Sequence, residues 1–396
     1  MKICFWIGNA YHRNWGTNKI VALIANELSK KYDVSLVVTE RNIIKNYDFY
    51  DDNIEIISMP ESKYIYKPSK KGFTSLLRSL VRVVNNKTSF FNAQGRVEIM
   101  KEAFYPGYLI DNFTDFFKNK QYDVIIASGH EIIWLALFAD RLKPETKTIG
   151  WQHNSYGSYV SGKYAVFRNK EELLKKYIPN LNAFVMLNPY DADKYKEKLG
   201  IDAEYIYNAL TLKAITKTDL SQKQFFMAGR FSRQKGVDLL IDAFKLFCKY
   251  NNEWTLIIAG DGKQRMRTIK KVWENKIQDR VRLVGFVDNM EKYYLESSVY
   301  LMSSRYEGWG LVVPEALEFG LPVIAFDITP MDLMIDTGEN GVIVQKFNIK
   351  KYAAAMLKLA NDESLRKKMG EAAIIKAKEF DIENIVKRWE ELLSSV

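Results

Sequence analysis

The sequence predicts an α/β protein built from two doubly wound domains. Short apolar, β-branched runs alternate with longer amphipathic stretches from the N-terminus onward, a pattern typical of βαβ units in a parallel sheet. The series occurs twice, in residues 1–210 and again in 224–380. Because a domain averages about 150 residues, a chain of 396 residues has room for two domains of this kind.

Seven strand candidates define the N-terminal domain. They are short runs at 3–7, 34–38, 54–57, 124–127, 148–151, 183–187 and 205–207. Between the first two, Ile20 to Leu28 carry apolar side chains at helical spacing, and we expect helices between the later strands too. The first run has one Lys and ends at Gly8, without the longer apolar core of a signal peptide, so it is predicted to be a strand.

A polar segment at 211–223, rich in Thr, Ser, Lys and Gln, is predicted to link the two domains. A second series of strands follows at 225–228, 256–259, 281–284, 300–302, 322–326 and 341–344. Helices are expected at 239–247, 352–359 and 365–377. The segment 381–396 contains a last helix, which we expect to cross back to the N-terminal domain. Ligands bind outside the carboxyl ends of strands in open α/β sheets, so the site is expected in a cleft between two facing domains.

Composition excludes several classes of protein. With 47% hydrophobic and 27% charged residues the chain is an ordinary globular protein. Cys4 and Cys248 lie far apart, which indicates neither a disulfide framework nor a thiolate metal site and fits a reducing cytosol. No apolar run approaches the roughly 18 residues that span a bilayer. The net charge of +10 favours an anionic partner such as nucleotide phosphate, anionic lipid or nucleic acid.

Two glutamates flank the glycines that follow the strand at 300–302. Glu307 falls in the loop and Glu315 at the start of the next helix. The amides of a helix start attract anions, and Gly308 and Gly310 allow a ligand to approach the backbone. This pattern predicts a site for a diphosphate. The alternative is a turn followed by a helix in which the two glutamates only complement the helix dipole.

Two cations follow the strand at 225–228. Arg230 lies just past the strand end, and Lys235 lies at the opening of a helix. The planar guanidinium of Arg can donate two hydrogen bonds to phosphate oxygens, and Lys supplies a compact positive charge. The pair could therefore neutralise a leaving diphosphate without a metal. The alternative is an exposed basic turn.

These motifs resemble the retaining glycosyltransferases of family 4. The similar segments are the two glutamates with seven residues between them, the G-R-F-x-x-x-K-G run at 229–236, Ala-Gly-Asp-Gly at 259–262 and Val-Gly-Phe-Val at 284–287. They occur in the family's order and cover nearly the whole second domain. The resemblance implies a GT-B fold, an acceptor-binding first domain, a nucleotide-sugar donor held mainly by the second, transfer with retention of anomeric configuration, and no metal or other cofactor.

The resemblance also implies roles for individual residues. Arg230 and Lys235 would hold the donor diphosphate, and Glu315 the ribose hydroxyls. Glu307 and the loop amides after it would hold the transferred sugar and the β-phosphate. Phe286 would lie near the base. The donor-binding set that it implies is Gly16, Thr17, Gly229, Gly262, Phe286, Val287, Gly308, Trp309, Gly310, Leu311 and Glu315.

The resemblance is looser in the first domain. Thr17 stands where the family often has a second glycine, while the segment at 151–154 resembles the family's donor-sugar histidine segment. This points to His153, which joins Glu307, Arg230 and Lys235 in the expected catalytic set. The alternative for His153 is a hydrogen-bonded residue at a strand end.

The other two histidines are given no catalytic role. His12 lies in the first loop and could approach the acceptor, whereas His130 and Glu131 are predicted to be a pair at a helix start.

Two apparent motifs are better explained otherwise. Gly260-Asp261-Gly262 begins like a dinucleotide-binding loop, but Arg265 replaces the third glycine and makes a nicotinamide cofactor a poor fit. Asp191 and Asp193 imitate a metal-binding D-x-D, yet they follow Asn-Pro and are predicted to be helix-start residues. We therefore expect no metal site.

Residues 62–97 contain no acidic residue. The segment carries a helical apolar pattern from Phe73 to Val84 with basic residues around it, as an interfacial helix does. The cations expected to contact an anionic membrane or its lipid-linked acceptor are Lys70, Lys71, Arg78 and Arg82. The alternative is a helix whose apolar stripe packs on the sheet while its cations are solvated.

The sequence thus favours a retaining, metal-independent hexosyltransferase. We expect a UDP-sugar donor, a glycan or lipid-linked acceptor of surface-polysaccharide (capsule) synthesis, and a place at the cytoplasmic face of the cell membrane. The alternatives are a sugar-nucleotide epimerase or sugar-phosphate transferase of GT-B fold, and a non-catalytic GT-B partner protein. A nucleic-acid-binding protein is disfavoured because no nucleic-acid recognition motif is present.

Overall fold

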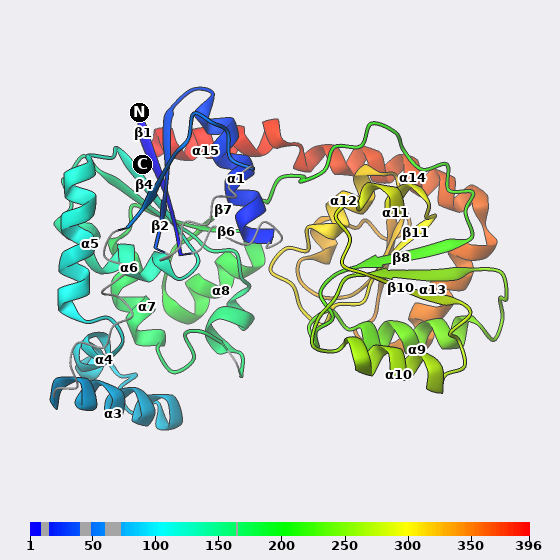
Figure 1. Cartoon of the computed structure of the whole chain (residues 1–396), viewed down its shortest axis with the longest axis horizontal. Coiled ribbons are helices and arrows are strands. Elements are labelled where there is room, and N and C mark those ends of the chain that lie inside the picture. Colours follow the sequence, from blue (N-terminus) through cyan, green and yellow to red (C-terminus); the bar gives the residue numbers. More distant parts are fainter. Residues whose placement is uncertain (9–15, 40–48, 60–72, 164) are drawn as a thin grey trace. The chain divides into compact units, whose positions relative to one another are not determined.

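The computed structural model describes residues 1–8, 16–39, 49–59, 73–163 and 165–396. The chain folds as two compact units (Figure 1): Met1–Tyr207 with Ile385–Val396 form the first, and Asn208–Asn384 form the second. Each unit holds one parallel sheet with helices packed on it. The predicted class, two doubly wound α/β domains, is confirmed.

The first unit has the strand order β3-β2-β1-β4-β5-β6-β7. Cys4, Phe5 and Trp6 of β1 are fully buried, as expected for an inner parallel strand covered on both faces. The order reverses between β1 and β4, which marks the carboxyl edge there as a place for ligands. The strands are β1 (Lys2–Ile7), β2 (Asp33–Val38), β3 (Glu55–Ser58), β4 (Val124–Ser128), β5 (Lys147–Trp151), β6 (Ala183–Met186) and β7 (Glu204–Tyr205).

Aromatic packing fixes the helices of the first unit on its sheet. The ring of Trp6 lies 5.3 Å and 4.8 Å from the rings of Phe113 and Phe117, measured between centroids. Further from the sheet, α3 packs on α4 (Figure 1). The helices are α1 (Gly16–Ser29), α3 (Phe73–Thr88), α4 (Val97–Phe104), α5 (Gly107–Lys120), α6 (Glu131–Phe138), α7 (Glu171–Tyr177) and α8 (Pro189–Leu199).

The second unit has the strand order β10-β9-β8-β11-β12-β13. Its strands are β8 (Gln224–Ala228), β9 (Thr255–Ala259), β10 (Val281–Gly285), β11 (Val299–Met302), β12 (Val323–Phe326) and β13 (Gly341–Val344). Its helices are α9 (Val237–Phe247), α10 (Arg265–Glu274), α11 (Glu291–Leu295), α12 (Val312–Glu318), α13 (Ile349–Asn361) and α14 (Glu363–Ala377). Helix α13 packs beside α9, and α14 beside α12 (Figure 1).

Short helical turns complete the two units. Turns of 3-10 helix occupy Gln94–Arg96, Ala139–Arg141, Ile178–Asn180, Met331–Leu333 and Lys378–Phe380, and Gly157–Ser161 forms a π-helical turn.

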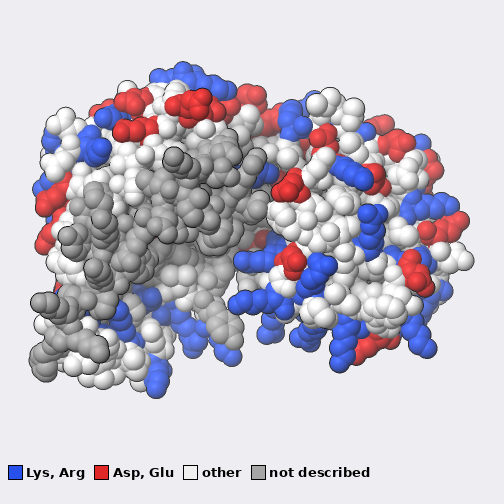
Figure 2. All heavy atoms as spheres, in the orientation of Figure 1, with Lys and Arg blue, Asp and Glu red and all other residues white. Residues whose placement is uncertain are grey.

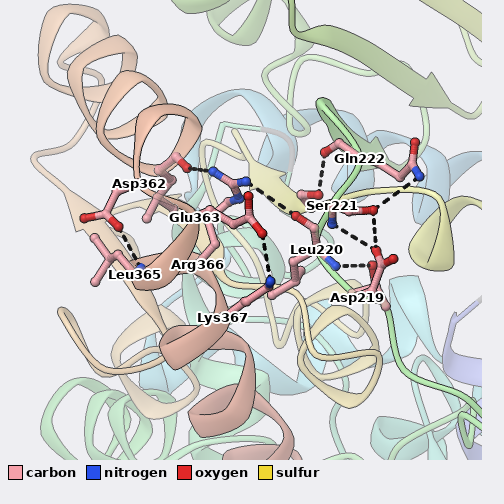
Figure 3. Close-up of polar contacts among 12 residues, drawn as sticks. Asp219, Leu220, Ser221, Gln222, Asp362, Glu363, Leu365, Arg366 and Lys367 are labelled. Atoms are coloured by element: carbon pink, nitrogen blue, oxygen red, sulfur yellow. Dashed lines mark hydrogen bonds and ion pairs between the residues drawn. The ribbon is translucent and has the colours of Figure 1, made fainter.

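The polar segment 211–223 belongs to the second unit, because the chain divides between Tyr207 and Asn208. Its backbone is fastened to that unit at several points. The Thr218 amide donates to the Phe319 carbonyl over 3.0 Å, and the Arg366 guanidinium of α14 donates to the Leu220 carbonyl over 3.5 Å (Figure 3).

Helix α15 (Ile382–Ser395) begins in the second unit and continues into the first. The buried Trp389 ring meets Trp151 edge to face, with centroids 4.7 Å apart, and Lys31 pairs with Glu390 at 2.7 Å. The last twelve residues therefore pack as part of the first unit.

Of the helices that the structure describes, none is both long enough and apolar enough to cross a lipid bilayer.

Candidate donor site

Two loops of the second unit emerge side by side at the carboxyl edge of its sheet. Strands β8 and β11 are neighbours and parallel, with Phe225 opposite Val299. The loop after β8 carries Arg230 and Lys235, and the loop after β11 carries Glu307. Parallel pairing thus brings together residues that lie more than seventy positions apart in the sequence.

Backbone contacts hold the two loops together. The Arg305 amide donates to the Gln234 carbonyl over 2.7 Å, and the Ser303 hydroxyl donates to the Lys235 carbonyl over 2.9 Å. Gly236 has φ +62°, and a Cβ there would lie 2.0 Å from the Ser303 carbonyl oxygen. Only glycine fits so close an approach in this conformation.

A bidentate ion pair also holds the two loops together. The Arg305 guanidinium donates to both carboxylate oxygens of Asp238, over 2.8 Å and 2.7 Å. Burial of Asp238 opposes its ionisation, but the hydrogen bonds and charge of Arg305 prevail and hold the pKa of Asp238 below its usual range. The start of α9 is thereby fixed against the loop that carries Glu307.

Lys235 and Glu307 form a largely buried ion pair. The Lys235 Nζ atom lies 2.7 Å from Glu307 Oε1, and the two side chains are 18% and 6% exposed. The Gln234 side-chain amide (Nε2) donates to Glu307 Oε2 over 3.4 Å. The Lys235 stem passes over Gly229, where a Cβ would lie 3.3 Å from its methylene carbons. The structure thus brings these predicted residues together.

Arg230 lies two residues past the end of β8 and is exposed. Its stem runs beside the next loop, because a Cβ on Gly262 would lie 3.1 Å from Arg230 Cγ. The loops after β8 and β9 are therefore packed against each other, and a Cβ on Gly260 would approach the Gly229 carbonyl oxygen to 2.0 Å.

The loop after β11 combines accessible and buried residues. Gly308 and Leu311 are partly exposed, whereas the Trp309 side chain is 2% exposed and its ring lies 5.6 Å from Phe380. Gly310 has φ +97°, and a Cβ there would lie 3.2 Å from the Met331 methyl carbon. The buried side chain of Trp309 therefore anchors this loop.

Glu315 lies in the first turn of α12 and is 7% exposed. The Thr211 hydroxyl donates to Oε1, and the Tyr294 hydroxyl donates to Oε2 over 2.8 Å. Burial, reinforced by the Glu315 carboxylate, raises the pKa of Tyr294 well above its usual range, so this hydroxyl stays protonated. Sequence reasoning missed both partners, since neither belongs to a motif.

An exposed aromatic ring also lies at the carboxyl edge of the sheet of the second unit. Phe286 directly follows β10 and is 55% exposed, and Val287 beside it is partly exposed. The Gly260 amide donates to the Gly285 carbonyl over 2.6 Å, which places this loop beside the loop after β9. An exposed ring is suited to stacking on a planar base.

The predicted residues of the first unit lie at the carboxyl edge of its own sheet. Gly16 and Thr17 begin α1. His153 follows β5 and is 9% exposed, with its ring 4.3 Å from that of Trp151. Burial lowers the pKa of His153 to about 3, so the imidazole is neutral. Among the described residues neither ring nitrogen has a hydrogen-bond partner.

His130 and Glu131 begin α6, as predicted. Burial lowers the pKa of His130 to about 4 and raises that of Glu131 to about 8. His12 lies outside the described residues.

Helix α3 presents its apolar side chains outward. Leu76, Leu80 and Val83 are 69%, 59% and 51% exposed. By contrast, Arg78 pairs with Glu102 of α4 at 2.5 Å, and Arg82 donates to the Ala103 carbonyl over 2.6 Å.

For these three residues, the alternative of an apolar stripe packed on the sheet is therefore wrong. Each arginine has an acceptor on α4, and Arg82 is still exposed, so contact of Arg78 and Arg82 with a membrane or acceptor stays a prediction. Lys70 and Lys71 lie outside the described residues.

Asp191 lies in the first turn of α8, as predicted, and Asp193 lies in the next turn of the same helix. Asn188 caps α8 by accepting the Asp191 amide over 2.9 Å, and the buried Asp191 carboxylate accepts from the Asn188 side chain and the Tyr156 amide. Within the described parts of the chain, no three His, Cys, Asp or Glu side chains cluster as metal ligands.

Positive charge is not confined to these loops. Figure 2 shows Lys and Arg side chains along the lower edge of the second unit, where Figure 1 places α9 and α10. Helix α10 alone carries Arg265, Arg267, Lys270 and Lys271. The net charge by itself therefore does not locate the site.

Known proteins resemble this chain in part or over its whole length. Residues 210–376 match the family model "Glycosyl transferases group 1". An uncharacterized glycosyltransferase of Haemophilus influenzae is 26% identical over 99% of both chains. The poly(glycerol-phosphate) alpha-glucosyltransferase of Bacillus subtilis is 27% identical over 60% of this chain and 36% of its own length.

Solved structures show the fold. The crystal structure of TarM from S. aureus superposes with a TM-score of 0.77 at 16% identity, covering 100% of this chain and 99% of the TarM chain. The two parallel-sheet units and this likeness establish the GT-B fold. Residues 210–376 are therefore similar to the group 1 glycosyltransferases, and the chain has the GT-B fold.

Proposed function

We propose that the chain is a retaining hexosyltransferase that uses a UDP-sugar and acts on a glycan or lipid-linked acceptor of surface-polysaccharide synthesis. The observation that carries the proposal is the buried pair of Lys235 and Glu307, held 2.7 Å apart by two interlocked loops. Burying an ion pair costs desolvation free energy, so such a pair is weak evidence for a role in stability. We therefore assign this pair a role in function. The match of residues 210–376 to group 1 glycosyltransferases supports a donor site here.

In the proposed reaction the bond between the anomeric carbon and the β-phosphate oxygen breaks, and its electron pair stays on the phosphate. Arg230 and Lys235 stabilise that developing charge, the task of a divalent ion in other transferases, so no metal is required. The acceptor hydroxyl bonds to the anomeric carbon on the same face, and its proton passes to the departing phosphate oxygen. Glu307 positions the sugar and stabilises its cationic character without forming a covalent bond.

The remaining residues have binding roles in this proposal. Glu315 accepts hydrogen bonds from the ribose, and the exposed ring of Phe286 stacks on the base. His153, neutral and without a partner among the described residues, hydrogen-bonds a hydroxyl of the transferred sugar.

For the acceptor we propose a phosphate-containing glycan or polyol. The name of the Bacillus subtilis relative, a poly(glycerol-phosphate) alpha-glucosyltransferase, supports this class, and a net charge of +10 suits an anionic polymer.

We further propose that the chain works at the inner face of the cell membrane through α3. The outward Leu76, Leu80 and Val83 would enter the interface, and the acid-free segment 62–97 around them would attract anionic lipid.

A nucleotide-sugar panel tests the proposal. Thermal stabilisation by donors, slow donor hydrolysis and transfer to a polyol-phosphate acceptor are expected for the parent. Epimerised sugar nucleotide as the product would establish the epimerase alternative, and transfer of sugar together with phosphate the phosphotransferase. Donor binding by none of the panel would support a non-catalytic partner protein.

A further inference from the structure

The segment that follows the first unit is fastened along α12. The Thr211 hydroxyl donates to Glu315, the Ala214 amide donates to Glu318 over 3.1 Å, and the Lys217 ammonium donates to the same Glu318 oxygen over 2.7 Å. Both glutamates are buried, at 7% and 2% exposed. Since they lie one helical turn apart, residues 211–217 cover one side of α12.

Glu315 is held by two hydroxyl groups from different elements. Thr211 contacts Oε1 and Tyr294 contacts Oε2, so each carboxylate oxygen has its own fixed donor. The Tyr294 ring is itself stacked on Phe319, with centroids 4.9 Å apart. A carboxylate clamped at both oxygens cannot rotate without losing a buried hydrogen bond.

Recognition of adjacent hydroxyl groups on a sugar requires such a fixed orientation. A carboxylate oxygen has lone pairs for more than one donor, so a ribose hydroxyl can share an oxygen with Thr211. If the carboxylate turned, its lone pairs would no longer point at the two ribose hydroxyls, and discrimination between ribose and its deoxy forms would be lost.

We propose that Thr211 is a positioning residue that orients Glu315 for the ribose of the nucleotide. The inference rests on the proposed function, in which Glu315 holds the ribose. It adds that recognition of the nucleotide depends on the segment 211–217, which follows directly on the first unit, and not only on the loops at the sheet edge.

The test compares binding of a nucleoside diphosphate with binding of its 2′,3′-dideoxy form by calorimetry. The nucleotide is whichever of UDP, GDP and ADP binds the parent most tightly. A hydrogen bond to a charged group corresponds to about a tenfold or larger change in affinity, so the parent should bind the dideoxy form at least about tenfold more weakly. In Thr211→Val this ratio should fall to about twofold, while Thr211→Ser should restore it.

Thr218→Val is the matched control. Its hydroxyl lies directly after the segment 211–217 and donates to the Ser297 carbonyl over 2.9 Å instead of contacting Glu315. The control should keep the parent ratio, which separates the orientation of Glu315 from general loosening of the segment.

The possible outcomes separate the role of Thr211 from the proposed ribose-binding role of Glu315. A parent that discriminates ribose, with Thr211→Val discriminating equally, overturns the role of Thr211 and leaves the donor site intact. A parent that binds no nucleotide, or binds ribose and dideoxyribose forms alike, overturns the assigned role of Glu315 and with it this inference. Loss of the ratio in Thr218→Val as well as in Thr211→Val also overturns it, because the effect would then not depend on contact with Glu315.

Discussion

Individual side chains in the second unit are placed by contacts between loops that are distant in the sequence. Lys235 and Glu307 meet because β8 and β11 are neighbours, and Gly236 lets their loops approach. Spacing along the chain indicated that both residues follow strand ends. It could not indicate that their side chains pair, because strand order is set by the packing of the whole sheet.

Replacement of either member of this pair should lower turnover strongly. We expect Glu307→Gln and Lys235→Ala each to reduce kcat by a hundredfold or more, since each removes about 3 kcal/mol of charge stabilisation from the transition state. Steady-state transfer assays measure the loss. Lys175→Ala is the control, because Lys175 forms a 2.8 Å pair with Glu172 within α7 of the first unit. Folded variants with near-parent turnover would refute the assignment.

Buried histidines should make the first unit sensitive to acid. The folded pKa of His153 is about 3, below the ordinary value of 6.5, so between these values only the unfolded chain binds the proton and stability falls as pH falls. The loss is about 1.4 kcal/mol per pH unit for this residue.

His153→Asn should therefore lose less stability than the parent between pH 6.5 and 5, measured by the thermal unfolding midpoint across this range. Glu131, with a pKa raised to about 8, acts in the opposite direction in both proteins, so the difference isolates His153. Parallel profiles for parent and variant would contradict the neutral, buried imidazole.

At the level of elements, apolar patterning predicted the strands well and the environment of α3 poorly. Inner parallel strands are buried on both faces, so continuous apolar runs such as that of β8 identify them directly. For α3 the helical periodicity predicted an apolar stripe but not what covers it. The surroundings of α3 depend on α4, where the Glu102 carboxylate and the Ala103 carbonyl accept hydrogen bonds from Arg78 and Arg82.

The outer face of α3 should carry lipid binding. Burial of a Leu or Val side chain is worth about 1.5–3 kcal/mol, so changing Leu76, Leu80 and Val83 together to Ser should weaken binding to anionic vesicles by at least about a hundredfold. Vesicle co-sedimentation measures this at low and high salt, with attraction decreasing as salt rises.

A double change of exposed apolar residues in α10, Met266→Ser with Trp273→Ser, serves as the control for this experiment. Equal vesicle binding by the triple variant and the parent would show that α3 does not contact lipid.

Helix α14 joins two parts of the second unit through a buried arginine. Arg366 is 4% exposed and donates to the carbonyls of Leu359 and Ala360 at the end of α13 and to Leu220 (Figure 3). Its neighbour Lys367 forms only an exposed pair with Glu363.

Arg366→Leu should destabilise the protein by about 2–4 kcal/mol, because buried carbonyl groups lose their donor. Lys367→Leu, the adjacent control, should change stability by less than about 1 kcal/mol. Chemical denaturation compares the two variants, and similar midpoints for both would contradict the structural role of Arg366.

At the scale of the whole molecule, the tandem pattern of strands predicted the two α/β units, and the motifs of the second unit predicted where its loops gather. The contacts of Glu315 could not be predicted, because Thr211 lies 104 positions away and carries no motif of its own. Likewise, nothing in the local sequence of α15 identifies Trp151 as the partner of Trp389. Such contacts arise only when elements distant in the sequence pack together.

The most direct test of the central claim is the anomeric configuration of the transferred sugar, determined by proton NMR on product formed from an α-linked UDP-sugar in excess EDTA. We expect an α-linked product, and activity undiminished by the chelator, since Arg230 and Lys235 stabilise the leaving diphosphate. A β-linked product would contradict retention. Activity lost in EDTA and restored by magnesium or manganese would contradict the metal-free mechanism.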